Sequence, residues 1–120
     1  MKAAEIKKLL TKVRSLCLAL PEVNEVEAWG HPTFRAPKKM FAAFGSSEEE
    51  GPTLGLKVGF DLQEELLKDS RFFPTPYAAH QGWVSLKMNT KVKWKEVEQL
   101  LEVAYRQVAN QRMLKLLDAR

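Results

Sequence analysis

Hydrophobic and polar residues alternate along several short segments of the chain, which is the pattern of strands that bury only one face. The clearest examples are Leu54–Val58 and Trp83–Met88, with a shorter one at Thr33–Ala36. Successive side chains of a strand point to opposite sides of its sheet, so each segment has an apolar face and a face carrying lysine, arginine or tryptophan. An antiparallel sheet can leave one face open to solvent. We therefore expect a sheet whose open face is basic and aromatic.

Two longer segments repeat their apolar residues at helical spacing, one at each end of the chain. Residues 3–20 predict an amphipathic helix that Pro21 ends, and a closing helix is expected from Lys93, extending as far as Leu117 if Asn110 does not interrupt it. A short helix over 62–69 is predicted between the strands, with Asp61 as its N-cap. The expected strands are 23–29, 33–36, 40–44, 53–58 and 83–88.

Turn-forming residues separate these elements. Gly30-His31-Pro32 and Pro37-Lys38-Lys39 predict turns, and Gly45–Pro52 predicts a mobile hairpin loop. Residues 71–82 contain two prolines and no periodicity, so they are expected to form a structured crossing loop.

The resulting order is helix, four strands, helix, strand, helix. It predicts one α+β domain over residues 1–120, with the helices packed on one side of an antiparallel sheet. The apolar stripes of the first and the closing helix and the apolar faces of the strands are expected to meet in one buried layer. Its predicted members are Leu9, Leu10, Val13, Leu56, Leu86, Val97, Leu101 and Ala104.

Composition narrows the function classes only a little. The net charge of +4 permits an anionic partner but also serves solubility alone. The single cysteine, Cys17, excludes an intramolecular disulfide and lies in an apolar helical stripe, where it is expected to act as a small core residue.

The N-terminal segment interleaves lysines with apolar residues, so neither a signal peptide nor a membrane span is expected. A cytoplasmic protein without a membrane partner is therefore predicted.

No metal or catalytic motif is evident. His31 and His80 are far apart in the sequence and lack a second ligand at helical spacing, while Glu48, Glu49 and Glu50 form a run typical of a solvated loop. There is no glycine-rich phosphate loop and no nucleophile elbow. We therefore expect no metal site, no cofactor and no catalytic residue, and a non-enzymatic role is favoured.

Trp29, His80 and Trp83 leave two alternatives open. If both tryptophans lie exposed on the open face, they indicate a binding site or a small-ligand pocket. If a helix or the 71–82 segment covers them, they are core residues. His80 either converges on the open face beside Trp83 or bonds the loop backbone and holds Trp83 in place.

The order and spacing of several short motifs match a known family. These motifs are Leu20-Pro21, Trp29-Gly30 before the Phe34 strand, Lys39-Met40-Phe41-Ala42, Leu54–Lys57, Tyr77 with His80 and Trp83, and Ala104-Tyr105. Over about residues 3–110 the chain resembles the MmcQ/YjbR family of small bacterial proteins. The resemblance implies a fold related to frataxin-like and secretion-chaperone-like domains. It also implies DNA binding, because members are commonly labelled DNA-binding on the basis of paired hairpin wings.

Two features depart from what these relationships imply. The acidic run Glu48–Glu50 lies in the natural wing hairpin and would repel phosphate. The first helix is mainly basic, whereas frataxins collect iron on an acidic first helix, so iron handling is disfavoured.

Three functions follow as rival hypotheses. The leading one is a non-enzymatic domain that binds DNA or another nucleic acid weakly and with little sequence preference. Its predicted contacts are phosphate contacts from Arg35, Lys38, Lys39, Lys57, Lys87, Lys91 and Lys93, with Trp83 or Trp29 stacking on unpaired bases. The second is a module that binds a protein or peptide on the open sheet face. The third is a small-ligand or enzymatic role for a pocket around Trp29, His80 and Trp83.

Overall fold

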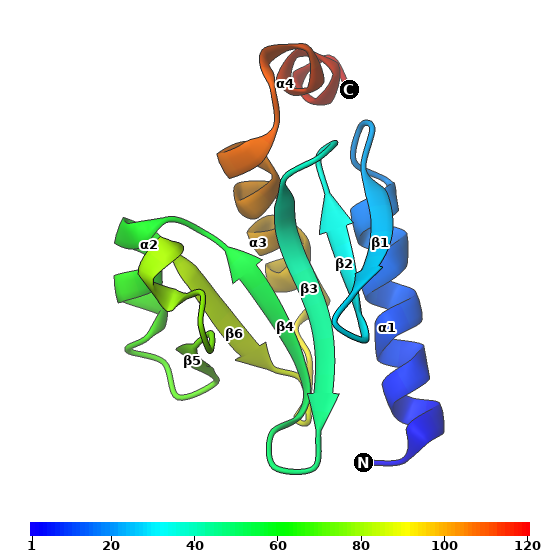
Figure 1. Ribbon diagram of the computed structural model, residues 1–120, viewed down its shortest axis with the longest axis vertical. Coiled ribbons are helices and arrows are strands. Elements are labelled where there is room, and N and C mark those ends of the chain that lie inside the picture. Colours follow the sequence, from blue (N-terminus) through cyan, green and yellow to red (C-terminus); the bar gives the residue numbers. More distant parts are fainter.

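A six-stranded antiparallel sheet forms the centre of the protein in the computed structural model, which describes all of residues 1–120 (Figure 1). The helices are α1 (Ala3–Leu18), α2 (Phe60–Leu66), α3 (Trp94–Val108) and α4 (Gln111–Asp118), with a 3-10 turn η1 at Ala79–Gln81. The strands are β1 (Asn24–Ala28), β2 (His31–Arg35), β3 (Met40–Ser47), β4 (Gly51–Lys57), β5 (Phe72–Pro74) and β6 (Trp83–Lys87). Their order across the sheet is β1-β2-β3-β4-β6-β5, so the last strand in the chain is inserted between β4 and β5.

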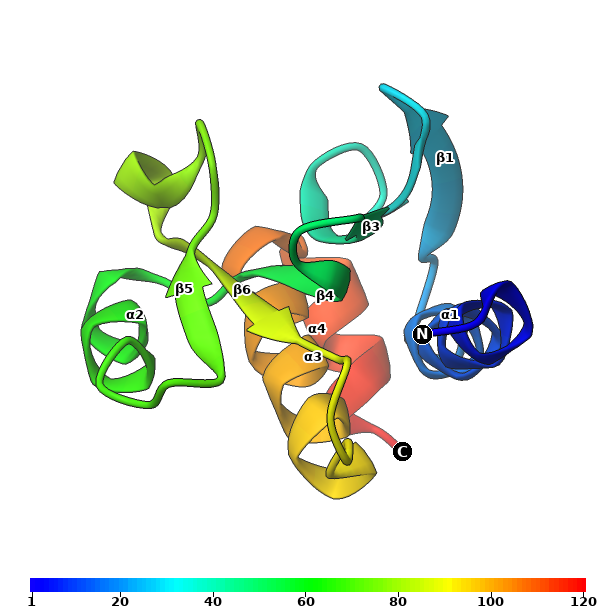
Figure 2. The same ribbon diagram turned by 90° about the horizontal axis from the view of Figure 1, so that it is seen from below.

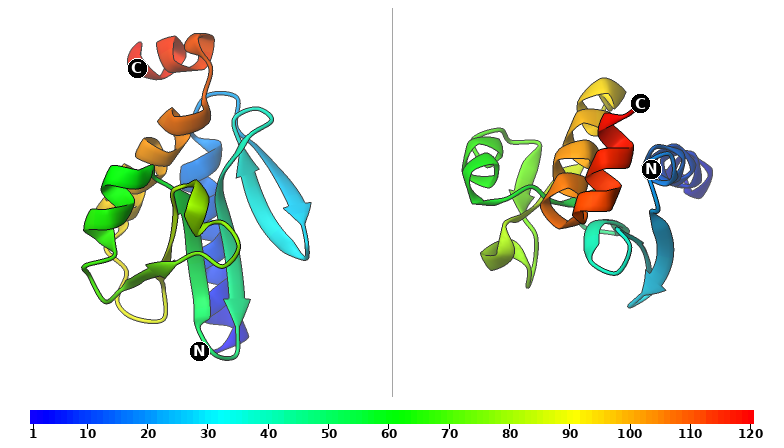
Figure 3. Two further views of the ribbon diagram at one scale, coloured as in Figure 1. Left: turned by 60° about the vertical axis from the view of Figure 1, so that its left-hand side comes forward. Right: turned by 90° about the horizontal axis from the view of Figure 1, so that it is seen from above.

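The main helices lie on one face of this sheet, as the sequence predicts. Figures 2 and 3 show α1, α3 and α4 together on one side, while the β1–β2 hairpin and the segment before β6 project from the other. The short helix α2 lies at the β5–β6 edge. No helix combines the length and the apolar character needed to cross a bilayer.

The core lies between this helix layer and the sheet. Val13, Leu56, Leu86, Val97, Leu101 and Ala104 are buried there as predicted, while Leu9 and Leu10 pack against the core half-buried. The Tyr105 ring meets Phe41 edge-on, and its hydroxyl donates a 2.8 Å hydrogen bond to the carbonyl of Pro21. That bond links the closing helix to the end of α1 and satisfies the one polar atom of a buried ring.

Two local predictions were wrong because backbone geometry overrode residue composition. The first hairpin turn is Trp29-Gly30, and His31 and Pro32 belong to β2. A two-residue hairpin loop of this kind needs positive φ at both positions, and Trp29 and Gly30 have φ values of 52° and 77°. Gly59, not Asp61, caps α2, which begins two residues earlier than predicted.

The structure also adds elements that the sequence pattern did not reveal. Asn110 divides the closing helix in two: its side chain accepts a hydrogen bond from the Met113 backbone N–H, so it caps α4. The segment 71–82 contains β5 and η1 in addition to loop. The polar hairpin 45–52 is mostly strand, because β3 and β4 pair out to Ser47 and Gly51.

Candidate functional site

The face of the sheet that α1, α3 and α4 leave free, here called the uncovered face, can be assigned from the strand register. Phe34, Leu54 and Leu86 belong to the core, so their sequence neighbours point to the other side. The centre of the uncovered face consists of small residues on adjacent strands, because Thr33 pairs with Ala43, Ala43 with Gly55 and Gly55 with Ser85. Thr33, Gly55 and Ser85 are nevertheless buried, and the Trp83 ring lies over Gly55, so side chains cover the centre of this face even though no helix does.

The charged residues of the uncovered face are all basic. Alternation places Arg35, Lys57 and Lys87 on it, as the sequence predicts. The two carboxylates of β1 point the other way: Glu25 pairs with Phe34 and forms a 2.6 Å ion pair with Arg14 of α1, and Glu27 shares its side. No strand residue assigned to the uncovered face is acidic, which favours an anion over a cation as ligand.

The predicted cations fall into two groups at opposite ends of the sheet. Arg35, Lys38, Lys39 and Lys57 lie where β2 and β4 end and β3 begins. Lys87, Lys91 and Lys93 lie at the other end, in β6 and the connection to α3. None of the seven forms an ion pair with a carboxylate. All seven charges therefore remain available for an anionic partner.

Two of these cations, Lys87 and Lys93, lie near an aromatic ring or a carboxylate. The ammonium of Lys87 lies 5.9 Å from the centre of the Phe73 ring, a cation–π distance. Lys93 lies near Asp69, whose carboxylate accepts hydrogen bonds from Arg71, and Arg71 also contacts Glu96. Bonding to Arg71 is the main cause of the low pKa of Asp69, about 2, to which Lys93 adds. Lys93 therefore lies near a cluster with two carboxylates, which offset part of its positive charge.

Trp83 lies on the uncovered face but is not accessible. Only 6% of it is exposed, and it is the one buried hydrophobic residue outside the main core cluster. Its ring lies over Gly55, 3.6 Å from the point where a Cβ would be. The amide of Gln63 in α2 donates to the carbonyls of Trp83 and Ala79, which joins α2 to η1 and to the start of β6. Of the two alternatives, the covered one holds for Trp83, and a ring in this position does not stack on a base.

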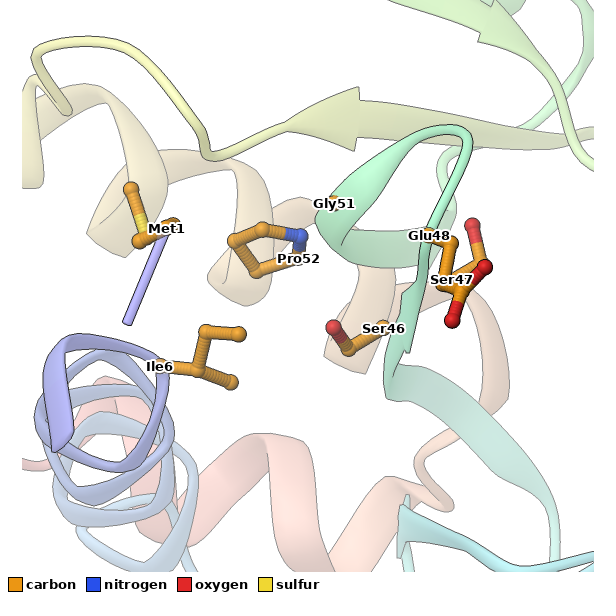
Figure 4. Close-up of a pocket in the computed structure, with 7 residues that line it drawn as sticks. All are labelled: Met1, Ile6, Ser46, Ser47, Glu48, Gly51 and Pro52. Atoms are coloured by element: carbon orange, nitrogen blue, oxygen red, sulfur yellow. The ribbon is translucent and has the colours of Figure 1, made fainter. Parts of the chain in front are cut away.

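Trp29 and His80 do not join Trp83 in a pocket. Trp29 is 85% exposed at the tip of the β1–β2 hairpin, and His80 is exposed in η1. A cavity of about 430 Å³ lies elsewhere, where Met1 and Ile6 of the N-terminal segment face Ser46 and Pro52 of the β3–β4 hairpin (Figure 4). A second, of about 320 Å³, lies between α1 and α3. Neither is lined by the three predicted pocket residues.

Two residues that the sequence did not single out as ligand contacts lie in positions relevant to binding. The His31 ring lies over Gly45, 3.6 Å from the position of a Cβ there, on the uncovered face. Tyr77 is 99% exposed in the segment that connects β5 to β6. In the sequence, Tyr77 stood out only as part of the family motif with His80 and Trp83 and as an aromatic residue directly after Pro76.

Two observations concern chemistry-bearing groups away from the uncovered face. Burial, with a smaller effect of Glu25, raises the pKa of the Cys17 thiol, so this buried thiol stays protonated at neutral pH. No three residues among histidine, cysteine, aspartate and glutamate come together in a way that would hold a metal ion.

Comparison with known proteins identifies the family. No curated protein shows significant sequence similarity to the chain. Among solved structures, the chain is similar to a Deinococcus radiodurans protein with a DUF419 domain, with a TM-score of 0.73, 22% identity, and coverage of 91% of this chain and 87% of the other. It is also similar to a Pseudomonas syringae protein, with a TM-score of 0.62, 19% identity, and coverage of 73% and 88%. These similarities establish the fold. The YjbR family model matches residues 18–107, three quarters of the chain, and the protein therefore belongs to the YjbR family.

Proposed function

We propose that this protein binds nucleic acid weakly and with little sequence preference, through phosphate contacts on the uncovered face. The observation that carries the proposal is the charge pattern of this face: Arg35, Lys57 and Lys87 lie on it, no strand residue on it is acidic, and none of the three cations is neutralised by an ion pair. Phosphate contacts of this kind act on any sequence. Lys38, Lys39 and Lys91 extend the basic character beyond the strands.

The positions of the helices favour binding that depends little on nucleic-acid sequence. Proteins that recognise base edges commonly insert a helix into the major groove. Here α2 is short and carries Glu64 and Glu65 on its exposed surface, and α3 and α4 lie on the opposite side of the sheet. The strands of the uncovered face are therefore a better contact surface than the helices. They offer positive charges for phosphates and few groups that could recognise particular bases.

The direct test removes two cations from this face. The double variant Lys57→Ala with Lys87→Ala should weaken binding to unrelated sequences about equally. It should also lower the salt slope of log affinity by about 0.7 for each phosphate of a single strand that the protein no longer neutralises. Anisotropy titrations of a labelled oligonucleotide at several salt concentrations measure both quantities.

A matched control removes the same charge from the helix side. Lys7 and Lys8 are exposed on α1, so Lys7→Ala with Lys8→Ala reduces the net charge of +4 equally but leaves the uncovered face intact. Equal losses of affinity from both double variants would show that net charge, and not this face, governs binding. Salt-independent binding, or none at low salt, would contradict the proposal and favour a protein or peptide partner.

The acidic hairpin gives a second prediction. Glu48, Glu49 and Glu50 are exposed at the β3–β4 turn and form no ion pair, and only the backbone N–H of Glu50 is bonded, to the Ser47 hydroxyl. Replacing the three with serine should leave the melting temperature nearly unchanged. It should strengthen nucleic-acid binding by removing repulsion if this hairpin approaches the phosphates as a wing. Unchanged affinity would place the nucleic acid away from the hairpin.

A further inference from the structure

Two exposed aromatic residues occupy turn positions that ordinarily take glycine or asparagine. Apart from the glycines, only Glu22, Trp29 and Tyr77 have positive φ, and Glu22 is held by an ion pair with Arg112. A bulky residue in this backbone region is unusual and is a pointer to function where nothing packs against it. Trp29 and Tyr77 are the two most exposed large hydrophobic residues of the chain.

Trp29 is the first central residue of the β1–β2 hairpin turn. Ala28 pairs with His31, so Trp29 and Gly30 alone form the loop, and both have positive φ. This is the geometry of a type I′ turn, whose preferred sequence is asparagine followed by glycine. Tryptophan replaces the asparagine, and its ring extends into solvent instead of packing.

Tyr77 is the second central residue of a different turn. The Ala78 N–H donates to the Thr75 carbonyl at 3.2 Å, which closes a four-residue turn with Pro76 second and Tyr77 third. Proline second and positive φ third define a type II turn, in which the third residue is normally glycine. The Thr75 hydroxyl lies 2.9 Å from that of Ser85, so the turn is attached to the uncovered face.

The two turns stand on either side of the same surface. Figure 2 shows the β1–β2 hairpin and the segment before β6 projecting on the side away from the helices, with β3 and β4 between them. The strands that carry the small residues of the uncovered face lie between the two aromatic turns, and the cations lie toward the two ends of these strands. We infer that Trp29 and Tyr77 are stacking platforms for unpaired bases and that the ligand of the uncovered face is single-stranded nucleic acid. This inference rests on the proposed function and adds that the nucleic acid is single-stranded.

The chemistry selects a single strand over a duplex. Stacking on an aromatic side chain requires a free base face, which a paired base within a duplex does not offer. The lysine and arginine side chains of the same face would contact the phosphates of the strand that carries the stacked bases. Since every base has a stacking face, this arrangement retains the low sequence preference of the proposed function.

The test uses asparagine substitutions that suit the turns. Trp29→Asn and Tyr77→Asn remove the rings while supplying a residue that tolerates positive φ, so the melting temperature should stay the same or rise. Each should weaken binding of an oligothymidylate by roughly 5- to 150-fold, the range for one stacked base. Duplex binding and the salt slope should stay unchanged, because the phosphate contacts remain.

Three variants serve as controls. Trp29→Phe and Tyr77→Phe keep an aromatic ring and should retain most of the affinity. Leu18→Asn, which removes an exposed apolar side chain from α1, should have no effect.

The outcomes separate this inference from the proposed function. If the asparagine variants bind oligothymidylate as tightly as the unmodified chain, or lose duplex and single-strand binding equally, the stacking inference is wrong. The proposed function then still stands if Lys57→Ala with Lys87→Ala lowers the salt slope. If the unmodified chain binds neither nucleic acid at low salt, both are wrong.

Discussion

Replacing Trp83 with alanine should lower the free energy of unfolding by about 3–5 kcal/mol, the usual cost of truncating a buried aromatic residue. The ring is almost fully buried on the uncovered face, where it lies over Gly55 of β4. Its removal would leave a cavity over β4 that neighbouring strands cannot fill without breaking their pairing. Urea unfolding followed by circular dichroism measures the change.

Trp29→Ala is the matched control, because it removes the same side chain from an exposed position. Its effect should stay within about 0.5 kcal/mol, as for surface substitutions in general. A decrease in unfolding free energy below about 1 kcal/mol for Trp83→Ala would mean that the ring is not packed as described. The comparison also separates two roles: Trp83 supports the uncovered face through stability, whereas Trp29 is expected to act on binding alone.

Replacing Leu101 with alanine should destabilise the protein by about 2–5 kcal/mol. Leu101 is 1% exposed and lies on α3 in the core cluster. Truncation removes apolar area that is buried against the sheet and leaves a cavity in the layer joining α3 to the strands. The same urea titration measures the decrease in stability, which should appear in the midpoint with little change in slope.

Leu116→Ala is the control for this prediction. Leu116 lies on α4 and is 47% exposed, so its truncation should cost well under half as much. Similar decreases in stability at both positions would show that α3 packs no more tightly than the outer surface of α4. A cost below about 1 kcal/mol at Leu101 would contradict the packing of the closing helix.

Alternation and helical periodicity predicted most of the fold because they record burial directly. The pattern Leu54, Leu56, Val58 identified the core face of β4, and Lys57 and Gly55 on its other face followed from strand geometry alone. The stripe of Val97, Leu101 and Ala104 identified the buried face of α3 in the same way. The cations of the candidate site could be assigned to a face for the same reason.

Where prediction failed, local residue preferences conflicted with the structure. Tryptophan is not a turn residue by preference, so the turn was placed at Gly30-His31-Pro32, one residue too late. Tyr77 was likewise not recognised as a turn position, because nothing in its own sequence preference requires positive φ. Departures from local rules of this kind concentrate at functional sites. Trp29 was already a candidate stacking residue from the sequence, whereas Tyr77 became a proposed ligand contact only with the structure.

The sequence by itself determined the α+β class, the apolar and basic faces of the strands and the helices that cover the apolar face, since each depends on spacing within one segment. Only the tertiary structure decided that β6 lies between β4 and β5, that Trp83 is covered while Trp29 is free, and that the turns of Trp29 and Tyr77 project from the same side. These facts depend on which distant segments become neighbours. Periodicity states that a side chain points to one face of a sheet; the burial of that side chain depends on what another part of the chain places over it.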